Sequence, residues 1–506
     1  MATSGTTRRY VERFRASVAE VLGLSFDDGR LDDLADTLSR RVEESGSRTG
    51  SRYLDRLTSG AGWPEEWRTL AGRLTVGETY FFRYRDHFRA FSEAVLPALL
   101  CGDGGRLRLL SGGCASGDEA YSLAMLVRER FPLACAAGQV VIRGIDVNPS
   151  MIERAVSGHY SPWALRETPP ELVERHFRRD GQTFVLGAAV RSMVSFGEGN
   201  LIDDDPAVWG SEAWDVVFCR NVLMYLAPEA ARAVVARLER TLRPGGFLFL
   251  GHAETLRGLS EAFHLRHTHE TFYYQRREAA ERRPLVGARP AAPQPALDPA
   301  ALAADTSWVD AIRLASARIA TLAEAPQQKA APPLAPAAAA LDLGVAVELL
   351  RQERFADALE RLRALPPEWR TDADAALLHA ALLTHAGSLA EAEEACRELL
   401  ERDEMNAGAH YLTSLCREHA GDRQGAVEHD QTAVYLDPTF AMPRLHLGLL
   451  AKRMGDVETA RHELGHAQEL LAREDASRIL LFGGGFSREA LVEMCRAQLA
   501  RCGASP

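Results

Sequence analysis

The stretch Leu107-Arg-Leu-Leu-Ser-Gly-Gly-Cys-Ala-Ser-Gly-Asp-Glu-Ala-Tyr-Ser122 decides the fold of the central part of the chain. Its first five residues predict a strand, and its glycines predict a tight turn whose backbone can approach a ligand. Asp118 and Glu119 then open a helix, where acidic side chains suit the positive end of the helix dipole. Strand, glycine turn and helix in this order predict the first unit of a ligand-binding α/β sheet.

The chemistry of this turn favours a cationic ligand. No Gly-Lys-Ser/Thr follows the glycines, which excludes a P-loop, and the acidic helix start would repel a pyrophosphate. S-adenosylmethionine fits better because it carries a sulfonium and an ammonium group. The next predicted strand, Val140–Asp146, ends in a carboxylate that can accept both hydroxyls of a ribose. A cap for the helix that begins near Pro149 is the alternative role for Asp146.

Later predicted strands also end in polar or ligand-sized residues. Asn200 and Leu201 lie just past one strand, where they can contact an adenine, and Arg220 and Asn221 lie just past another. Ligands in open α/β sheets bind outside the carboxyl ends of the strands, so we expect these residues to share one edge with Asp146. A Pro-Gly-Gly turn then leads into a last apolar strand, which is common in Rossmann-like methyltransferases.

The C-terminal part shows an internal repeat with a period of 34 residues. Glycines, alanines and further small residues recur in one register, which resembles the tetratricopeptide repeat and implies a protein or peptide partner rather than a reaction. A generic helical bundle is the alternative. The residues in register are Gly387, Gly421 and Gly455; Ala392, Ala426 and Ala460; and Ala380, Ser414 and Gly448.

The whole chain is therefore expected to be an α/β protein with helical domains on either side. We expect an N-terminal helical substrate-recognition domain over residues 1–72 and a Rossmann-like methyltransferase domain over 73–278, with a small β-subdomain at about 165–197. An Ala/Pro-rich linker over 279–340 and an all-α tetratricopeptide solenoid over 341–506 complete the chain.

Composition narrows the classes of partner. The 506 residues are 46% hydrophobic and 25% charged, which is typical of folded protein, and the net charge of −11 argues against a nucleic-acid partner. No apolar stretch is long enough to insert into a membrane, and the N-terminus does not resemble a secretory signal. The eight cysteines are scattered without a C-x-x-C pair, which predicts a reducing cytoplasmic location and no metal site.

Six blocks of the chain resemble the CheR-type chemotaxis receptor methyltransferases. The resemblance covers about residues 8–275, and the blocks stand in the order in which the family has them. Some members of that family carry tetratricopeptide tails. The blocks are Thr75–Arg83, Gly113–Ser122, Gly144–Asp146, Asn200–Leu201, Cys219–Tyr225 and Gly251–Thr255.

The resemblance implies methyl transfer from S-adenosylmethionine to glutamate side chains of chemoreceptors, with S-adenosylhomocysteine as the second product. It implies that Glu119 lies near the methionine ammonium and that Tyr225 lies near the methyl group. The family commonly has asparagine where this chain has Gly77, which puts one cofactor contact in doubt. The residues that the resemblance places at the cofactor are Gly77, Thr79, Arg83, Gly113, Glu119, Asp146, Asn200, Leu201, Arg220 and Asn221.

The predicted reaction needs alignment more than acid–base chemistry. A glutamate carboxylate is already ionised at neutral pH, because its unperturbed pKa is about 4.3, and it needs no general base. We predict that Arg83 orients this carboxylate and that Tyr225 donates a hydrogen bond near the line of transfer. The alternatives are that Arg83 only pairs with Glu119 or Asp118 and that Tyr225 only packs.

Partner binding is predicted at two further places. The family meets the methylation helices of receptors through basic residues of its N-terminal domain, which here implies Arg40, Arg41 and Arg48, although a plain solvated helix face is the alternative. The hairpin at Asp180-Gly181 is short, so we expect no tether to a receptor's C-terminal peptide. The repeats are expected to bind an unidentified protein or peptide.

Two other functions are compatible with the sequence. The chain could be a non-catalytic scaffold that binds cofactor or receptor, which only Gly77 supports. It could also methylate a different acceptor such as a small molecule, which the basic N-terminal domain disfavours. Cofactor binding separates the first alternative from receptor methylation, and an alkali-labile product ester separates the second.

Overall fold

The computed structural model describes residues 5–59, 63–100, 106–136, 138–210, 213–278, 343–352, 354–365 and 367–503. The chain forms two compact units, Met1–Arg282 and Arg283–Pro506. The predicted linker, 279–340, lies outside the described residues, and the domain boundaries expected from the sequence stay predictions. Among the described helices, none has the length and apolar character needed to cross a membrane.

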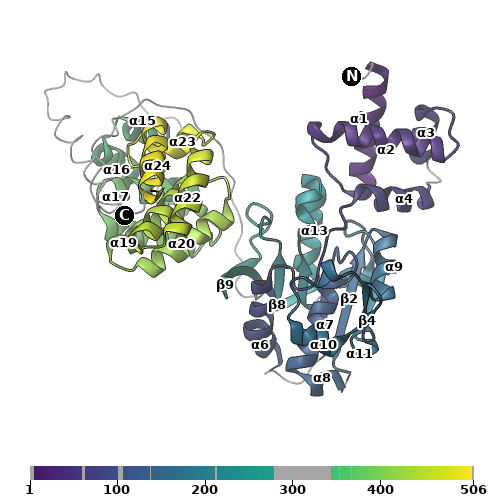
Figure 1. Ribbon diagram of the computed structural model, residues 1–506. Helices are drawn as coiled ribbons and strands as arrows, with labels where there is room; N and C mark the ends of the chain where they lie inside the picture. Colours follow the sequence, from purple (N-terminus) through teal and green to yellow (C-terminus); the bar gives the residue numbers. More distant parts are fainter. Residues whose placement is uncertain are drawn as a thin grey trace. The chain divides into compact units, whose positions relative to one another are not determined.

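The N-terminal unit begins with four helices that share one apolar core (Figure 1). Phe14, Leu34, Tyr53, Leu54 and Leu70 are fully buried there, because each helix turns one stripe of apolar residues towards the others. Leu24, just after the first helix, forms an antiparallel bridge with Leu226 of the sheet domain, so the two parts are joined through the backbone. The helices are α1 (Gly5–Leu22), α2 (Leu31–Glu44), α3 (Gly50–Leu57) and α4 (Pro64–Leu74).

A seven-stranded mixed sheet follows, in the spatial order β6-β2-β1-β7-β8-β10-β9. Five strands run parallel, whereas β10 is antiparallel to both of its neighbours. Chain order reverses between β1 and β7, so the carboxyl ends of these strands flank the point at which such sheets bind ligands. The strands are β1 (Leu107–Gly112), β2 (Val140–Asp146), β6 (Val194–Glu198), β7 (Trp214–Cys219), β8 (Leu242–Leu250), β9 (Phe263–Thr268) and β10 (Thr271–Arg276).

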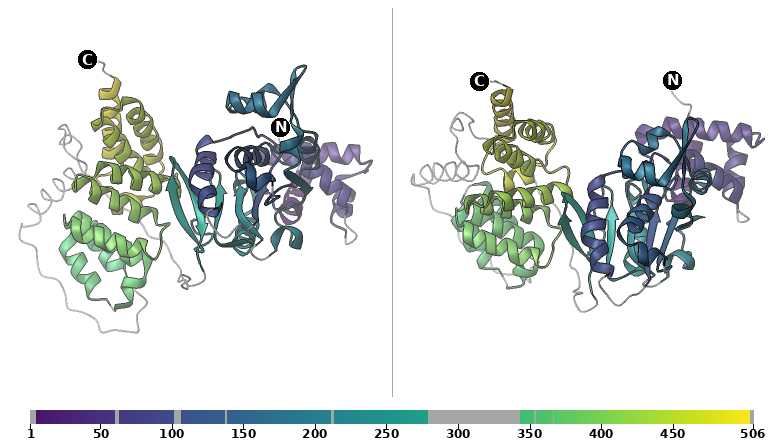
Figure 2. Two further views of the ribbon diagram at one scale, coloured as in Figure 1. Left: turned by 90° about the horizontal axis from the view of Figure 1, so that it is seen from below. Right: turned by 60° about the horizontal axis from the view of Figure 1, so that its bottom comes forward.

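Helices flank this sheet and bury its apolar strands (Figure 2). Stacked and edge-on rings of Phe88, Phe91, Phe218 and Phe249 fill the core between the sheet and the segment that follows the N-terminal helices. The helical elements are α5 (Arg85–Ala90), a π turn (Phe91–Val95), α6 (Leu96–Leu100), α7 (Asp118–Arg130), α8 (Pro132–Ala136), α9 (Pro149–Ser157), a 3-10 turn (Pro162–Leu165), α10 (Pro170–His176), α11 (Ala188–Arg191), α12 (Pro206–Trp209), a 3-10 turn (Leu223–Tyr225) and α13 (Pro228–Thr241).

The small β-subdomain is a three-stranded sheet of order β3-β5-β4. Its first strand, β3 (His159–Tyr160), precedes the expected start near residue 165, because two residues are too short to show an alternating pattern. The strands β4 (Phe177–Asp180) and β5 (Thr183–Leu186) form a hairpin around Gly181, whose φ of +59° suits a tight turn.

The C-terminal unit is a stack of antiparallel helix pairs, as the 34-residue period predicts. Ala392, Ala426 and Ala460 are fully buried in the second helices, and the glycines that end the first helices have φ of +77° to +85°. The pairs are α15 (Gly344–Arg351) with α16 (Phe355–Arg363), α17 (Ala373–His385) with α18 (Leu389–Leu400), α19 (Ala407–His419) with α20 (Arg423–Leu436), and α21 (Ala441–Arg453) with α22 (Val457–Leu471). A 3-10 turn (Pro367–Thr371), α23 (Ala476–Phe482) and α24 (Arg488–Gly503) complete the unit.

Candidate active site

A partly open cleft lies at the carboxyl ends of β1, β2 and β7, and it encloses about 1140 Å³ of space, part of which is open solvent. Small-molecule cofactors bind in concave sites of this kind. All ten residues that the sequence places at the cofactor line this cavity, and so does Tyr225. Their individual roles stay predictions. The loop between α1 and α2 adds a wall that the sequence did not predict, formed by Leu24, Ser25, Phe26 and Arg30.

The glycine turn after β1 has the close packing that its sequence predicts. Gly113 has φ of +73°, and a Cβ there would lie 2.4 Å from a methyl of Val222. Gly117 caps α7 with φ of +82°, and a Cβ there would lie 2.8 Å from the ring of Phe196. Larger residues at either position would clash or strain the turn, which fixes where α7 begins.

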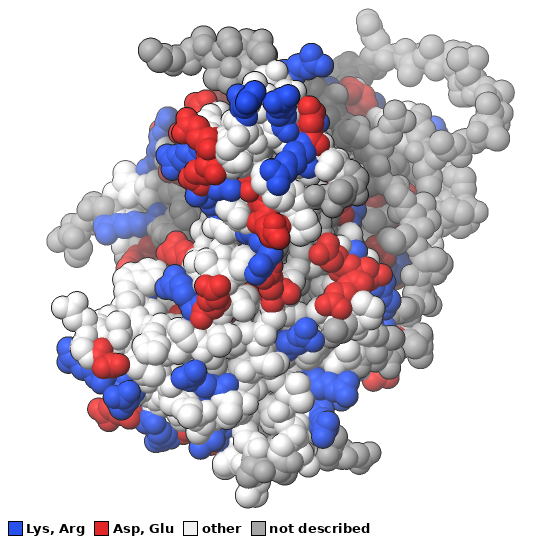
Figure 3. Space-filling model, turned by 90° about the vertical axis from the view of Figure 1, so that its right-hand side faces the viewer, with Lys and Arg blue, Asp and Glu red and all other residues white. Residues whose placement is uncertain are grey.

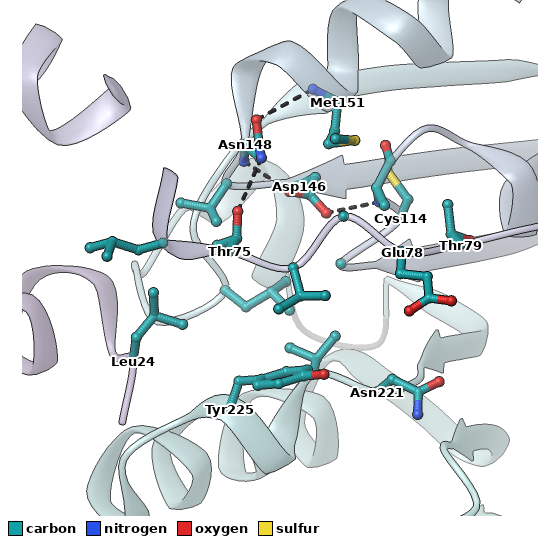
Figure 4. A pocket seen from close by; sticks show the side chains of 18 of the residues that line it. Leu24, Thr75, Glu78, Thr79, Cys114, Asp146, Asn148, Met151, Asn221 and Tyr225 are labelled. Carbon is teal, nitrogen blue, oxygen red and sulfur yellow. Dashed lines mark hydrogen bonds between the residues drawn. The ribbon is translucent and has the colours of Figure 1, made fainter. Parts of the chain in front are cut away.

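Asp146 presents its carboxylate at the end of β2 (Figure 4). Its two oxygens accept the backbone N–H groups of Ala115 and Asn148, each at 2.8 Å. Each oxygen keeps a further acceptor site, so the carboxylate can still bind two hydroxyls. Burial raises the pKa of Asp146, and the two backbone donors oppose that rise. The side chain of Asn148 caps α9, so the alternative that Asp146 is the cap is wrong.

Glu119 and Arg220 form a buried ion pair beside the glycine turn. The Arg220 Nη1 lies 3.1 Å from Glu119, and Ser111 donates a hydrogen bond of 2.7 Å to the other carboxylate oxygen. Burial raises the pKa of Glu119, whereas Arg220 and the Ser111 hydrogen bond lower it. Arg220 also donates to the backbone carbonyl of Arg83, so one guanidinium joins β7, α7 and the segment before α5.

Arg83 lies in a strained segment at the edge of the cavity. Phe82 and Tyr84 on either side of it have φ of +56° and +62°, a conformation that side-chain-bearing residues rarely adopt and that is concentrated at functional sites. The Arg83 side chain donates to the Glu78 carbonyl at 3.0 Å. Within the described residues no carboxylate forms an ion pair with Arg83, so the expected alternative of a pair with Glu119 or Asp118 is wrong.

Tyr225 lies across the cavity from Asp146, in the 3-10 turn that follows β7 (Figure 4). This turn is fixed by a residue that sequence reasoning did not assign, Glu254, whose side chain is buried. The Glu254 carboxylate accepts four backbone N–H groups, from Asn221 and Gly251 at 2.7 Å, from Val222 at 2.8 Å and from Met224 at 3.2 Å. The Gly251–Thr255 block carries this residue, but its spacing alone does not show what the carboxylate binds.

Gly77 faces a methionine instead of empty space. A Cβ at Gly77 would lie 2.5 Å from the Met151 Cε and 2.9 Å from its sulfur. Both residues line the cavity. The Met151 side chain therefore takes the space that an asparagine at position 77 would need.

The predicted receptor-contacting arginines differ in their surroundings. Arg40 and Arg48 are exposed. Arg41 is buried and forms two hydrogen bonds of 2.7 Å with Glu66, which also accepts one from Tyr53, so Arg41 holds the helices together and the prediction that it meets a receptor is wrong. Acidic and basic side chains are interleaved on the face shown in Figure 3.

The residues that line the cavity together fit S-adenosylmethionine. Asp146 suits the ribose hydroxyls, Glu119 suits an ammonium group, and Leu201 offers an apolar contact for a base. The Asn200 side chain donates to the Val21 carbonyl at 3.1 Å, so it links the cavity to α1. A Rossmann-like sheet with this set of donors and acceptors defines the class of S-adenosylmethionine-dependent methyltransferases.

Comparison with known proteins identifies the family. Residues 77–272 match the CheR methyltransferase, SAM binding domain. Chemotaxis protein methyltransferase 1 of Pseudomonas aeruginosa is 32% identical over 50% of this chain and 93% of its own length. Two proteins named probable biofilm formation methyltransferase WspC match more of the chain: the Pseudomonas putida protein is 28% identical over 89% of this chain and 96% of its own length, and the Pseudomonas aeruginosa protein is 30% identical over 79% and 85%. The chain belongs to the CheR methyltransferase family.

Proposed function

We propose that the chain transfers the methyl group of S-adenosylmethionine to glutamate side chains on the methylation helices of a chemoreceptor, as part of chemosensory adaptation. The observation that supports this best is that the described residues lining the cavity include no histidine, and that the carboxylates of Glu119 and Asp146 are engaged by Arg220 and by backbone N–H groups. Glu78 is the other carboxylate in the described lining. A glutamate acceptor is ionised at neutral pH and needs no general base, so it suits a lining in which most titratable groups already have partners.

The residues divide the task between binding and alignment. When bound, S-adenosylmethionine supplies a methyl group that its sulfonium has already activated. In this proposal Asp146 holds the ribose of the cofactor and Glu119 holds its methionine ammonium. Arg83 has no ion-pair partner in the described part of the chain, so its guanidinium can orient the incoming carboxylate. Tyr225 offers a hydroxyl from the wall across the cleft from Asp146, and the apolar side chains of the lining exclude part of the water around the carboxylate.

Receptor contact is proposed for the N-terminal helices. Arg30 lines the cavity from the loop before α2, with its guanidinium 4.7 Å from the Phe26 ring. A receptor helix that inserts a glutamate into the cavity passes this arginine, so Arg30 joins Arg40 and Arg48 as a candidate contact for the acidic residues around each methylation site. The repeats bind a further protein or peptide. A cytoplasmic location stays a prediction.

The proposal is tested with methyl-labelled S-adenosylmethionine and purified receptor cytoplasmic domains. The readout is base-labile methyl release from the receptor, because a glutamate methyl ester hydrolyses in alkali. We expect label on the receptor with wild type and a loss of at least about 10²-fold with Arg83→Ala, since misplacing the acceptor costs about that much. Cofactor binding by calorimetry should change much less in this variant.

Arg85→Ala is the matched control. Arg85 lies two residues away and forms an exposed ion pair with Glu167, at 3.1 Å. It should leave methyl transfer within about twofold of wild type, because exposed pairs contribute at most about 1 kcal/mol. Cofactor binding without label on any receptor tested would count against the acceptor. A chain that binds no cofactor would instead support the scaffold alternative.

A further inference from the structure

One segment of the repeat unit departs from the regular stack. After α22 the chain runs through the short helix α23 before it forms α24, yet α24 packs directly on α22. Helix α23 packs instead against α15 and α17, which are the first helices of two earlier pairs (Figure 1). We call residues 475–486 the return segment. The stack is continuous from α22 to α24 without it, so this segment behaves as an addition to the solenoid.

The return segment inserts apolar side chains between the first helices. Ile479 and Phe482 are 4% and 6% exposed, and the Phe482 ring lies 5.0 Å from the ring of Phe440 and 5.9 Å from that of Tyr411. A Cβ on Gly408 of α19 would lie only 2.8 Å from the Phe482 ring. Gly408 stands in the first turn of α19, and the missing side chain there leaves a slot for the aromatic ring.

The same face also recognises main-chain atoms of the segment. The last carbonyls of a helix have no partner within it. Here the His385 Nε2 donates to the Leu481 carbonyl at 3.0 Å, and the Tyr411 hydroxyl donates to the Phe482 carbonyl at 3.4 Å. The two donors come from successive repeats. Because they bind the backbone, they would serve any short helix that ends at this point.

A charge contact fixes the direction of the segment. Arg478 forms an ion pair with Asp437, and its guanidinium lies 5.2 Å from the Phe440 ring. Arg478 precedes Phe482 by four residues, so both side chains lie on one side of α23. An arginine at one end and an aromatic ring at the other therefore define the orientation in which a helix fits this face.

We propose that the face formed by α15, α17, α19 and the start of α21 is a binding site for a short amphipathic helix of a partner protein, and that the return segment occupies it in the free chain. The partner helix carries an arginine and, four residues later, an aromatic residue at its C-terminal end. When the partner helix displaces the return segment, α24 stays packed on α22. The glycines over 483–485, between α23 and α24, give the backbone the freedom that α23 needs to leave the face.

The test uses a fluorescent peptide with the sequence of residues 474–486 and the full-length chain. The wild-type chain is compared with a loosened chain that carries Ile479→Ala and Phe482→Ala. We expect the loosened chain to bind the peptide at least tenfold more tightly, because a tethered competitor has been weakened. A peptide in which Phe482 is replaced by Asp should not bind. The measurement needs neither cofactor nor receptor, so its failure is distinct from a failure of methyl transfer.

Two further measurements keep the result decisive. Adding Gly408→Leu to the loosened chain should abolish peptide binding, because the new side chain fills the ring slot; binding that persists would overturn the proposal. A loosened chain that keeps its helical circular dichroism and binds the peptide no better than wild type would also overturn it. If the loosened chain unfolds, hydrogen exchange of the wild type decides. Amides over 476–486 should exchange at least tenfold faster than the interior of α19, and equal protection would refute displacement.

Discussion

Replacing Glu254 by glutamine tests whether one buried carboxylate fixes the turn that carries Tyr225. The carboxylate accepts four backbone N–H groups at 2.7 to 3.2 Å. Glutamine keeps one oxygen and so keeps two of these hydrogen bonds, while its NH₂ group faces the other two donors. A hydrogen bond to a charged group contributes about 1.5–3 kcal/mol, so the loss of two should lower the free energy of unfolding by about 3–6 kcal/mol.

The assay combines stability with kinetics. Urea unfolding followed by tryptophan fluorescence reports mainly on the N-terminal unit, because five of the seven tryptophans precede residue 215. Methyl transfer should fall by about 10²-fold in kcat, since the turn places Asn221 and Tyr225 against the cavity and an error of 1 Å is costly. The KM for S-adenosylmethionine should change less, because Asp146 and Glu119 are held by other contacts.

The matched control is Glu229→Gln on α13. That side chain is 84% exposed and its nearest guanidinium, of Arg232, is 3.8 Å away. Its change in stability should stay within about 0.5 kcal/mol. Equal urea midpoints and equal kcat for the two variants would refute the role assigned to Glu254. A loss of stability with unchanged kcat would show that Glu254 supports the fold but does not position the turn.

Three other changes have defined outcomes. Gly77→Asn should weaken S-adenosylmethionine binding by about 10-fold, and adding Met151→Ala should restore it, because the methionine occupies the space that the new side chain needs; calorimetry measures both. Burial opposes a charge on His446, but the carboxylates that contact it raise its pKa to about 9. The pKa of histidine is about 6.5 in the unfolded chain, so protonated His446 stabilises the folded repeat unit fully below pH 6.5, and this stabilisation is lost as pH rises through 9. Urea unfolding of the repeat unit should therefore show a free energy of unfolding that falls by up to about 3 kcal/mol over this range. Gly448→Ala should destabilise the same unit by about 1–3 kcal/mol, because the new Cβ would lie 2.6 Å from the Leu464 side chain. Thermal unfolding followed by circular dichroism measures this, and an unchanged Tm would contradict the prediction.

Much of the architecture follows from local patterns in the sequence. Strand, glycine turn and helix over 107–122 need only neighbouring residues to form, and the 34-residue register repeats the same local choice in each pair of helices. Residues at the carboxyl ends of parallel strands must meet at one edge, so the grouping of Asp146, Asn200 and Arg220 was predictable without coordinates.

Contacts between distant segments were not predictable in this way. Arg40 and Arg41 are adjacent in the sequence, yet one is exposed and the other is buried against Glu66. Their difference depends on how α2 packs against α3 and α4. In the same way, Glu254 is an ordinary acidic residue in the sequence, and its four backbone partners come together only when β7 and β8 lie side by side.

The sequence by itself indicated the class of fold and the kind of cofactor, because hydrophobic periodicity, glycine turns and the carboxyl ends of strands are set by residues close in the chain. The family followed from the resemblance of six sequence blocks to its members, which the family match bears out. Only the tertiary structure decided which guanidinium pairs with Glu119, that Met151 fills the space beside Gly77, and that the return segment lies on the first helices of the repeats. The physical reason is that burial and ion pairing depend on what the folded chain brings within a few ångströms, which no local pattern encodes.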